Sequence, residues 1–92
     1  MLNKENIELC WAVLTKYGIR SQRLMVVEEC SELIKAVCKM FREMTAKNIE
    51  NFHEEVIDVI VMLQQMLLAD GISMEEVNRR AKEKLERALQ RL

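Results

Sequence analysis

A chain of 92 residues has room for one domain and not for a separate catalytic module, so we expect a single domain over residues 1–92. The formal net charge of -1 lacks the basic excess that binds a phosphate backbone, so we expect no nucleic-acid partner. Proline is absent and the only glycines are Gly18 and Gly71, which leaves few strand or tight-turn signals and predicts an all-α fold.

The cysteines and the placement of charged residues bear on the cellular compartment. The three cysteines form no CxxC pair, and reduced cysteines among apolar residues behave as small hydrophobic side chains. Charged residues from Lys4 onward interrupt the N-terminal segment, which therefore lacks the apolar run of a signal peptide. The uncharged stretch 59–69 is shorter than the roughly 20 residues that a bilayer requires. We therefore expect a cytoplasmic protein with no membrane partner.

Two helices are predicted in the N-terminal half. Asn3 can cap a first helix, whose apolar residues recur at helical spacing until Gly18 offers a C-terminal stop. Ser21 can cap a second, longer helix that ends near Met44 and Thr45.

Two further helices are predicted in the C-terminal half. The third begins around Ala46 and ends at the Asp70-Gly71 pair. Ser73, with Glu76 three residues later, matches the capping box that opens a helix, and the fourth helix then reaches the C-terminus.

The third helix predicts how the helices associate. Its segment 56–63 is apolar nearly all the way round, apart from Asp58, whereas an ordinary surface helix is apolar on one stripe only. Short connections favour antiparallel neighbours. We therefore expect an antiparallel helical bundle of about four helices, completed by oligomerisation into a homodimer or tetramer.

Acidic residues form two pairs on the second and third predicted helices. Glu29 and Glu32 are three residues apart, as are Glu55 and Asp58, so each pair shares one helix face. On antiparallel neighbours the four carboxylates can point at one place, where they repel unless a cation bridges them. Mg²⁺ prefers carboxylate oxygens and keeps positions for water and substrate phosphates.

Such pairs also occur on solvated helix faces, where they bind nothing. Asp58, however, lies within an apolar run, where an unpaired buried carboxylate costs several kcal/mol. Glu29 and Glu32 likewise lie between apolar residues. This context favours the interpretation as a metal centre.

The EExxE pattern of Glu28 to Glu32, followed by ExxD from Glu55 to Asp58, resembles the MazG-like group of all-α nucleoside triphosphate pyrophosphohydrolases over most of the chain. The resemblance implies Mg²⁺ ligation by Glu29, Glu32, Glu55 and Asp58. It also implies hydrolysis of a nucleoside triphosphate to the monophosphate and pyrophosphate, at a site assembled between subunits.

The last helix carries basic residues that the resemblance assigns to the substrate phosphates. Their helical spacing is compatible with that role, and the residues are Arg80, Lys84 and Arg87. They are interleaved with Glu83 and Glu86, so they can equally form a solvated stripe of an amphipathic helix.

Glu28 is the candidate catalytic residue, because it lies beside the predicted ligands and could orient the attacking water or accept its proton. Two other functions stay open. A phosphoribosyl-ATP pyrophosphatase is similar in length, although its family usually has a Tyr-His pair where this chain has Val59 to Met62. A non-catalytic helical dimer or regulatory module would keep the bundle without turnover.

Overall fold

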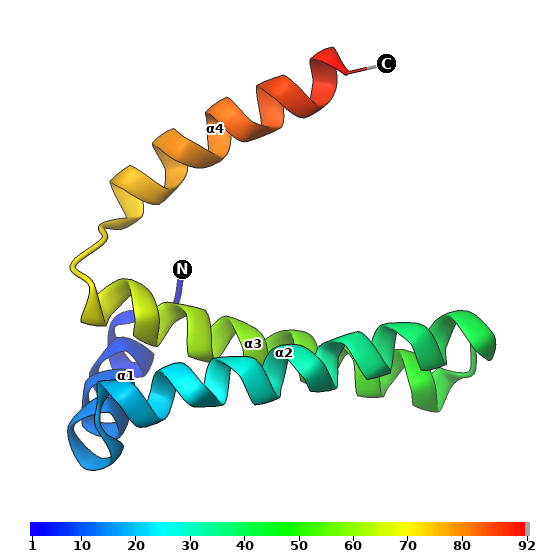
Figure 1. Ribbon diagram of the computed structural model, residues 1–92, viewed down its shortest axis with the longest axis horizontal. Helices are drawn as coiled ribbons and strands as arrows, with labels where there is room; N and C mark the ends of the chain where they lie inside the picture. The colour runs from blue at the N-terminus through cyan, green and yellow to red at the C-terminus, as the bar shows by residue number, and fades with distance from the viewer. Residues whose placement is uncertain (92) are drawn as a thin grey trace.

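The computed structural model describes residues 1–91 of the chain. Within this range the fold contains helices and no strand, which confirms the predicted all-α class (Figure 1). The helices are α1 (Lys4–Tyr17), α2 (Ile19–Arg42), α3 (Ala46–Ala69) and α4 (Met74–Gln90).

Side-chain caps start three of the helices. The Asn3 side chain accepts a hydrogen bond from the Asn6 backbone N–H at 2.9 Å, as predicted for the start of α1. Ser73 accepts from the Glu76 backbone N–H at 3.2 Å and begins α4, also as predicted. Thr45 caps α3 in the same way. These bonds satisfy backbone donors that a helix start leaves free.

The junction between α1 and α2 differs from the prediction. Gly18 alone separates the two helices, and its φ of 87° and ψ of 153° lie in a region essentially restricted to glycine. The predicted cap at Ser21 is therefore wrong, because α2 already begins at Ile19 and Ser21 lies in its first turn. At its other end α2 stops at Arg42, slightly earlier than predicted.

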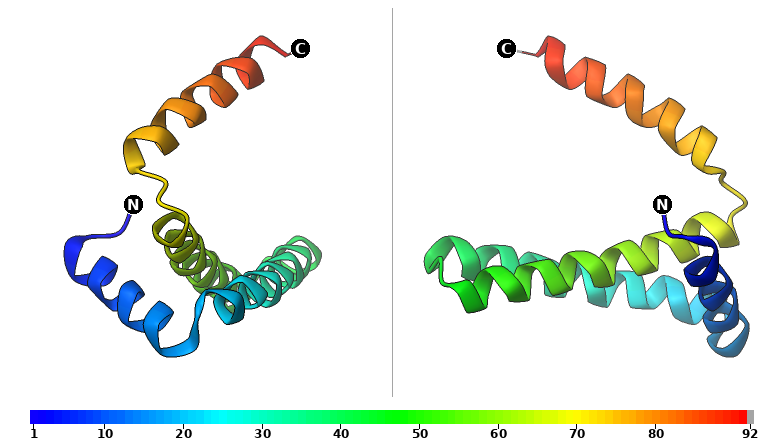
Figure 2. Two further views of the ribbon diagram at one scale, coloured as in Figure 1. Left: turned by 60° about the vertical axis from the view of Figure 1, so that its left-hand side comes forward. Right: turned by 180° about the vertical axis from the view of Figure 1, so that it is seen from behind.

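The first three helices pack together. α1 lies across the end of the α2–α3 hairpin where α2 begins and α3 ends (Figure 2). Its residues Cys10 and Leu14 are buried in that contact. At the same end, the Arg23 guanidinium binds the Asp70 carboxylate through two contacts of 2.6 and 3.2 Å, which joins the start of α2 to the end of α3. This hydrogen bond lowers the pKa of Asp70.

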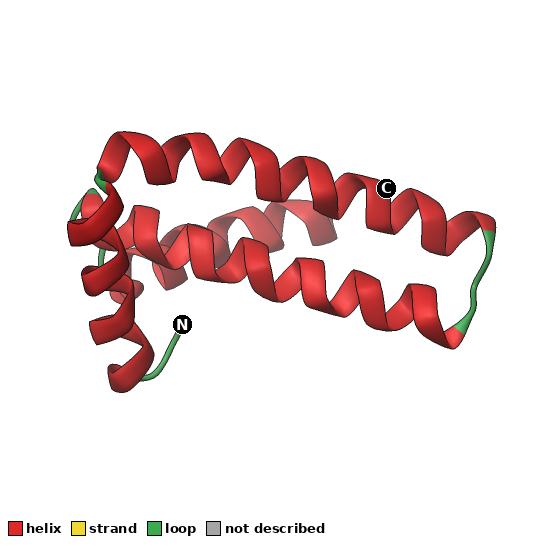
Figure 3. Ribbon diagram, turned by 90° about the horizontal axis from the view of Figure 1, so that it is seen from below, coloured by secondary structure: helices red, strands yellow, loops and turns green. Residues whose placement is uncertain are grey.

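α2 and α3 run antiparallel and side by side (Figure 3). On both helices, buried and half-buried side chains repeat at alternating intervals of four and three residues, which is the pattern of a helix–helix seam. The seam consists of Gln22, Val26, Glu29, Leu33, Ala36 and Met40 from α2, and of Asn48, Phe52, Glu55, Val59, Met62 and Met66 from α3. Two of these positions are occupied by glutamates.

α4 does not join this bundle. It makes no close backbone contact with α1, α2 or α3 and projects away from them (Figures 1 and 2). None of its described residues is buried, although it is strongly amphipathic. Thus the predicted number of helices is confirmed, but within one chain only three of them pack together.

No single helix within residues 1–91 is both long enough and apolar enough to cross a bilayer. α3 and α4 meet those criteria only when taken as a pair, and that pair is bent by 116°.

The backbone of Gly18 leads to a stability prediction. No atom lies within 4 Å of a Cβ added there, so Gly18→Ala is opposed only by the backbone conformation. We expect it to lower the free energy of unfolding by about 1–3 kcal/mol in urea titrations at fixed protein concentration. Gly71→Asn is the control, because φ at Gly71 is 68° and asparagine tolerates the left-handed region. Equal losses from both substitutions would contradict this account.

Candidate metal centre

Three carboxylates gather across the seam between α2 and α3. One oxygen atom from each of Glu29, Glu55 and Asp58 lies within 4.8 Å of the others. The two glutamates occupy seam positions and are half-buried, so the packing of the hairpin holds them opposite each other. Asp58 follows Glu55 by three residues, which places it on the neighbouring part of the same face. Carboxylate oxygens at this separation suit a hard divalent cation.

Glu32, the fourth predicted ligand, lies outside this group of three. Its carboxylate is 3.6 Å from the Lys35 Nζ, and its side chain is 52% exposed. The negative charge of Glu32 nevertheless contributes to raising the pKa of Glu55. The structure thus brings three of the four predicted carboxylates together and leaves Glu32 at the edge of the cluster.

The pKa of Glu55 reflects the negative charge of the cluster. Partial burial raises the pKa of its carboxyl, and the charges of Asp58, Glu29, Glu32 and Glu54 raise it further. Ionising Glu55 therefore means adding a negative charge to a place that is already negative. A bound cation would reverse that cost, so the donor set fits a metal ion.

Asp58 differs from the prediction in its burial. It was expected to be surrounded by apolar residues, whereas in the structure it is exposed, although its neighbour Val59 is buried. The reason is geometric, since consecutive residues of a helix point about 100° apart and only Val59 faces α2. The cost of an unpaired buried carboxylate therefore does not apply to Asp58 in a single chain.

Glu28 and Glu54 are each the immediate neighbour of a member of the cluster. Glu28, the predicted catalytic residue, is exposed, and its backbone carbonyl accepts a hydrogen bond from the Ser31 hydroxyl at 2.7 Å. Glu54 was not singled out from the sequence, yet its charge contributes to the electrostatics of Glu55. The sequence did contain a signal for Glu54, because it directly precedes Glu55. Only one of two consecutive helical residues can face the seam, so the other lies beside it and adds its charge from there.

The predicted phosphate-binding residues lie apart from the cluster. Arg80, Lys84 and Arg87 are on α4, which has no close backbone contact with the helices that carry the carboxylates. Arg80 instead donates a hydrogen bond to the Glu76 carboxylate at 2.8 Å on its own helix. Within one chain, the structure does not bring these cations to the acidic residues.

The residues that carry this cluster also match a known protein family. A family model described as the MazG nucleotide pyrophosphohydrolase domain matches residues 18–90. The match covers α2, α3 and α4, and thus every predicted site residue, and it leaves out α1. No curated protein and no solved structure matches the chain.

The raised pKa of Glu55 predicts how pH affects the metal-free protein. A carboxyl whose pKa is higher in the folded than in the unfolded chain stabilises the fold at acidic pH, and this contribution is lost as the pH rises through the folded-state pKa. Glu55→Gln should remove that loss. We expect the Tm of the variant in EDTA to exceed that of the wild type at neutral pH, with a difference that shrinks toward the ordinary glutamate pKa of 4.5.

Thermal unfolding across this pH range measures the effect. Glu86→Gln removes an exposed glutamate from α4 and should leave the pH profile unchanged. Parallel profiles for wild type and Glu55→Gln would show that the cluster does not strain the metal-free fold.

Proposed function

The chain belongs to the MazG nucleotide pyrophosphohydrolase domain family, and from that membership we propose that it hydrolyses a nucleoside triphosphate to the monophosphate and pyrophosphate in a Mg²⁺-dependent reaction. The observation that carries the proposal is the meeting of Glu29, Glu55 and Asp58 within 4.8 Å, inside the matched residues.

In this proposal Glu29, Glu55 and Asp58 hold the metal, and Glu32 completes the set from the edge of the cluster. Bound Mg²⁺ supplies neutralisation of the phosphate oxygens and a lower pKa for a coordinated water. The protein contributes the position of its ligands, because the seam fixes Glu29 and Glu55 on two different helices. Glu28, at the margin of the same cluster, orients the attacking water and accepts its proton.

The substrate phosphates require cations that the cluster itself lacks. Arg80, Lys84 and Arg87 can supply them only if α4 is brought to a cluster, and in its own chain α4 extends away from α2 and α3. We therefore assign these residues to the cluster of another copy of the chain. The amphipathic character of α4, with no residue buried, supports such docking.

The outer face of α2 supports association of at least two copies. Four large apolar side chains there are 61% to 74% exposed, and they recur at intervals of three and seven residues. They are Leu24, Val27, Ile34 and Phe41, and they lie on the side of α2 away from the seam. A stripe of this kind is typical of a helix that packs against a second helix. A chain of this size also has too small a core to tolerate that exposure easily.

The metal and the reaction are tested together. Mg²⁺ should raise the Tm of the wild type, because a ligand that binds only the folded state stabilises it by about 2.7 kcal/mol at a hundredfold excess over its Kd. Asp58→Asn should abolish pyrophosphate release and weaken the Mg²⁺ response, while the metal-free variant stays at least as stable as the wild type. The measurements are thermal unfolding and pyrophosphate release from a panel of nucleoside triphosphates.

Glu50→Gln is the matched control, since it removes a carboxylate from the same helix outside the cluster. Phosphoribosyl-ATP belongs in the panel, because preferential cleavage of that compound would indicate the related pyrophosphatase activity. Stabilisation by Mg²⁺ without any turnover would instead indicate a non-catalytic helical module. If Mg²⁺ changed neither Tm nor turnover, the metal centre would be refuted.

Association predicts the effect of a charge on the outer face of α2. Ile34→Glu should shift the protein toward the monomer in sedimentation equilibrium at micromolar concentration, because a carboxylate would then have to be buried in the interface. Lys39→Glu introduces the same residue at a charged, exposed position of α2 and should leave the mass unchanged. A folded wild-type monomer under these conditions would contradict the proposed oligomer.

A further inference from the structure

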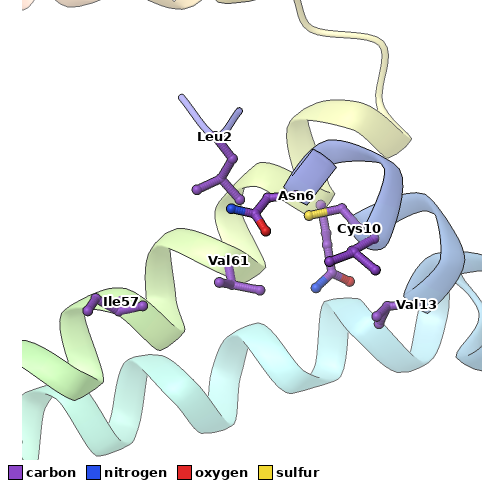
Figure 4. Close-up of a pocket in the computed structure, with 8 residues that line it drawn as sticks. Leu2, Asn6, Cys10, Val13, Ile57 and Val61 are labelled. Carbon is purple, nitrogen blue, oxygen red and sulfur yellow. The ribbon is translucent and has the colours of Figure 1, made fainter. Parts of the chain in front are cut away.

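An apolar cavity of about 300 Å³ lies between α1 and α3 (Figure 4). Its wall includes Leu9 and Val13 from α1, and Ile57 and Val61 from α3. Leu9 and Ile57 are 57% and 53% exposed, so the cavity opens to the surface as a groove. Gln65 also lines it, but the Gln65 Oε1 is buried and has no hydrogen-bond partner within residues 1–91. An occupant of the groove therefore meets mainly apolar atoms.

Carboxylates border the α3 side of this groove. Glu54 and Asp58 are exposed and four residues apart, so they lie along one line of the helix surface. Asp58 directly follows Ile57, and one residue turns a helix by about 100°. The apolar wall of the groove thus has an acidic edge, on the flank that leads to the cluster of Glu29, Glu55 and Asp58.

α4 carries a surface that complements this groove. Its apolar residues recur at intervals of four, four and three, and they are Val77, Ala81, Leu85 and Ala88. None of them is buried, and Leu85 is 65% exposed. A basic residue directly precedes each of the last three, in the pairs Arg80-Ala81, Lys84-Leu85 and Arg87-Ala88. The cations therefore follow one edge of the apolar stripe.

The order of these residues determines the direction in which α4 fits the groove. On α3 the acidic residue follows its apolar neighbour, whereas on α4 the basic residue precedes it, so the charges lie on opposite flanks of the two helices. Opposite flanks meet when two packed helices run parallel, and matching flanks meet when they run antiparallel. Parallel packing of Leu85 against Ile57 therefore brings Lys84 to the level of Asp58.

The α4 helix of the same chain does not meet this requirement. Only residues 70–73 connect α3 to α4, so an α4 that folded back along its own α3 would run antiparallel to it. Its cations would then lie on the flank away from Asp58. In the structure α4 is bent by 116° from α3 and makes no close backbone contact with it. The matching helix must therefore come from another copy of the chain.

The exposed area of the chain leaves room for such a contact. The chain exposes 7204 Å², whereas a compact monomer of 10.8 kDa exposes about 5,500 Å². The excess of roughly 1,700 Å² is about twice the area that each partner buries in a standard interface. A second copy can thus cover the groove in addition to the outer face of α2.

We propose that the groove between α1 and α3 receives α4 of a second copy, which runs parallel to α3 with its apolar stripe in the groove and its cations along the acidic edge. Arg80 then lies near Glu54, because Arg80 and Lys84 have the same spacing as Glu54 and Asp58. A two-fold axis that exchanges the directions of α3 and α4 fills the grooves of both copies at once, so the exchange closes as a dimer.

This inference rests on the proposed function, because it identifies the surface through which another copy brings Arg80, Lys84 and Arg87 to the metal centre. The contact itself requires neither a metal nor a nucleotide. It can therefore be tested in EDTA without substrate, independently of turnover.

Cross-linking of the wild-type protein with a carbodiimide, which joins a lysine amine directly to a carboxylate, tests the contact. Unlabelled and ¹⁵N-labelled chains are unfolded and refolded together in equal amounts, and the cross-linked peptides are identified by mass spectrometry. We expect Lys84 to link to Asp58 or Glu54, with mixed-isotope species as abundant as the two uniform species together. Lys82 is the internal control, because it lies on the other flank of the stripe and should not link to these carboxylates.

Substitutions on α4 test the apolar part of the contact. Leu85→Glu should lower the yield of the Lys84 cross-link by on the order of tenfold, because a carboxylate would have to enter the apolar groove. The matched control is Leu89→Glu, since Leu89 is 85% exposed and lies beside Asn78 on the flank opposite the cations. Equal yields in both variants would overturn the proposed contact.

Three results for the wild type would also overturn it. They are the absence of any Lys84 cross-link to Asp58 or Glu54, uniform-isotope species alone, which would indicate the α4 of the same chain, and equal cross-linking of Lys82. Any of these together with Mg²⁺-dependent hydrolysis would refute the contact and leave the proposed function standing. The expected cross-links in a protein without turnover would support the contact and refute the proposed function.

Discussion

The packing of α2 against α3 depends on side chains that face each other at regular intervals, and two of those places hold glutamates in place of apolar residues. Glu55 is costly to ionise in this contact, since burial and the neighbouring carboxylates raise its pKa. The same placement keeps the oxygens of Glu29 and Glu55 close to that of Asp58. In the proposed metal centre, packing and metal affinity would be coupled, because the residues that hinder close contact between the helices are those that a cation would join. The rest of the fold is arranged around this hairpin, with α1 across one end and the outer face of α2 uncovered.

Local features were the most predictable part of the fold. Asn3 and Ser73 were identified as caps because their side chains satisfy backbone donors within the same turn. The Ser21 side chain could also have capped a helix, but no helix starts there. Gly18 ends α1 and α2 begins at the next residue, so Ser21 already lies within α2. The spacing within the pairs Glu29/Glu32 and Glu55/Asp58 predicted that each pair shares a helix face, but not that Glu32 would lie beside Lys35. The unpaired oxygen of Gln65 could not be predicted from the sequence, because it depends on how the side chains of α1 pack against those of α3.

α4 shows where sequence patterns and single-chain packing diverge. Its apolar stripe predicts burial, yet no other helix among residues 1–91 covers it. Its charges are arranged along the helix instead, with Arg79 and Arg80 both near Glu76. Such exposed pairs contribute little to stability and are easily exchanged. The arginines are thus held by contacts weak enough for a more strongly charged anion to replace them.

The single-residue junction at Gly18 has a consequence for the width of the cavity. With 14 residues, α1 is about 21 Å long, so a rotation of about ten degrees at Gly18 would move its far end by about 4 Å. That far end carries Leu2 and Asn6, which line the cavity. It is tethered by the hydrogen bond from the Leu2 N–H to Gln64. The position of α1 over α3, and with it the distance between the cavity walls, is therefore set by the two backbone dihedral angles of Gly18, by the packing of Cys10 and Leu14, and by the hydrogen bond of Leu2.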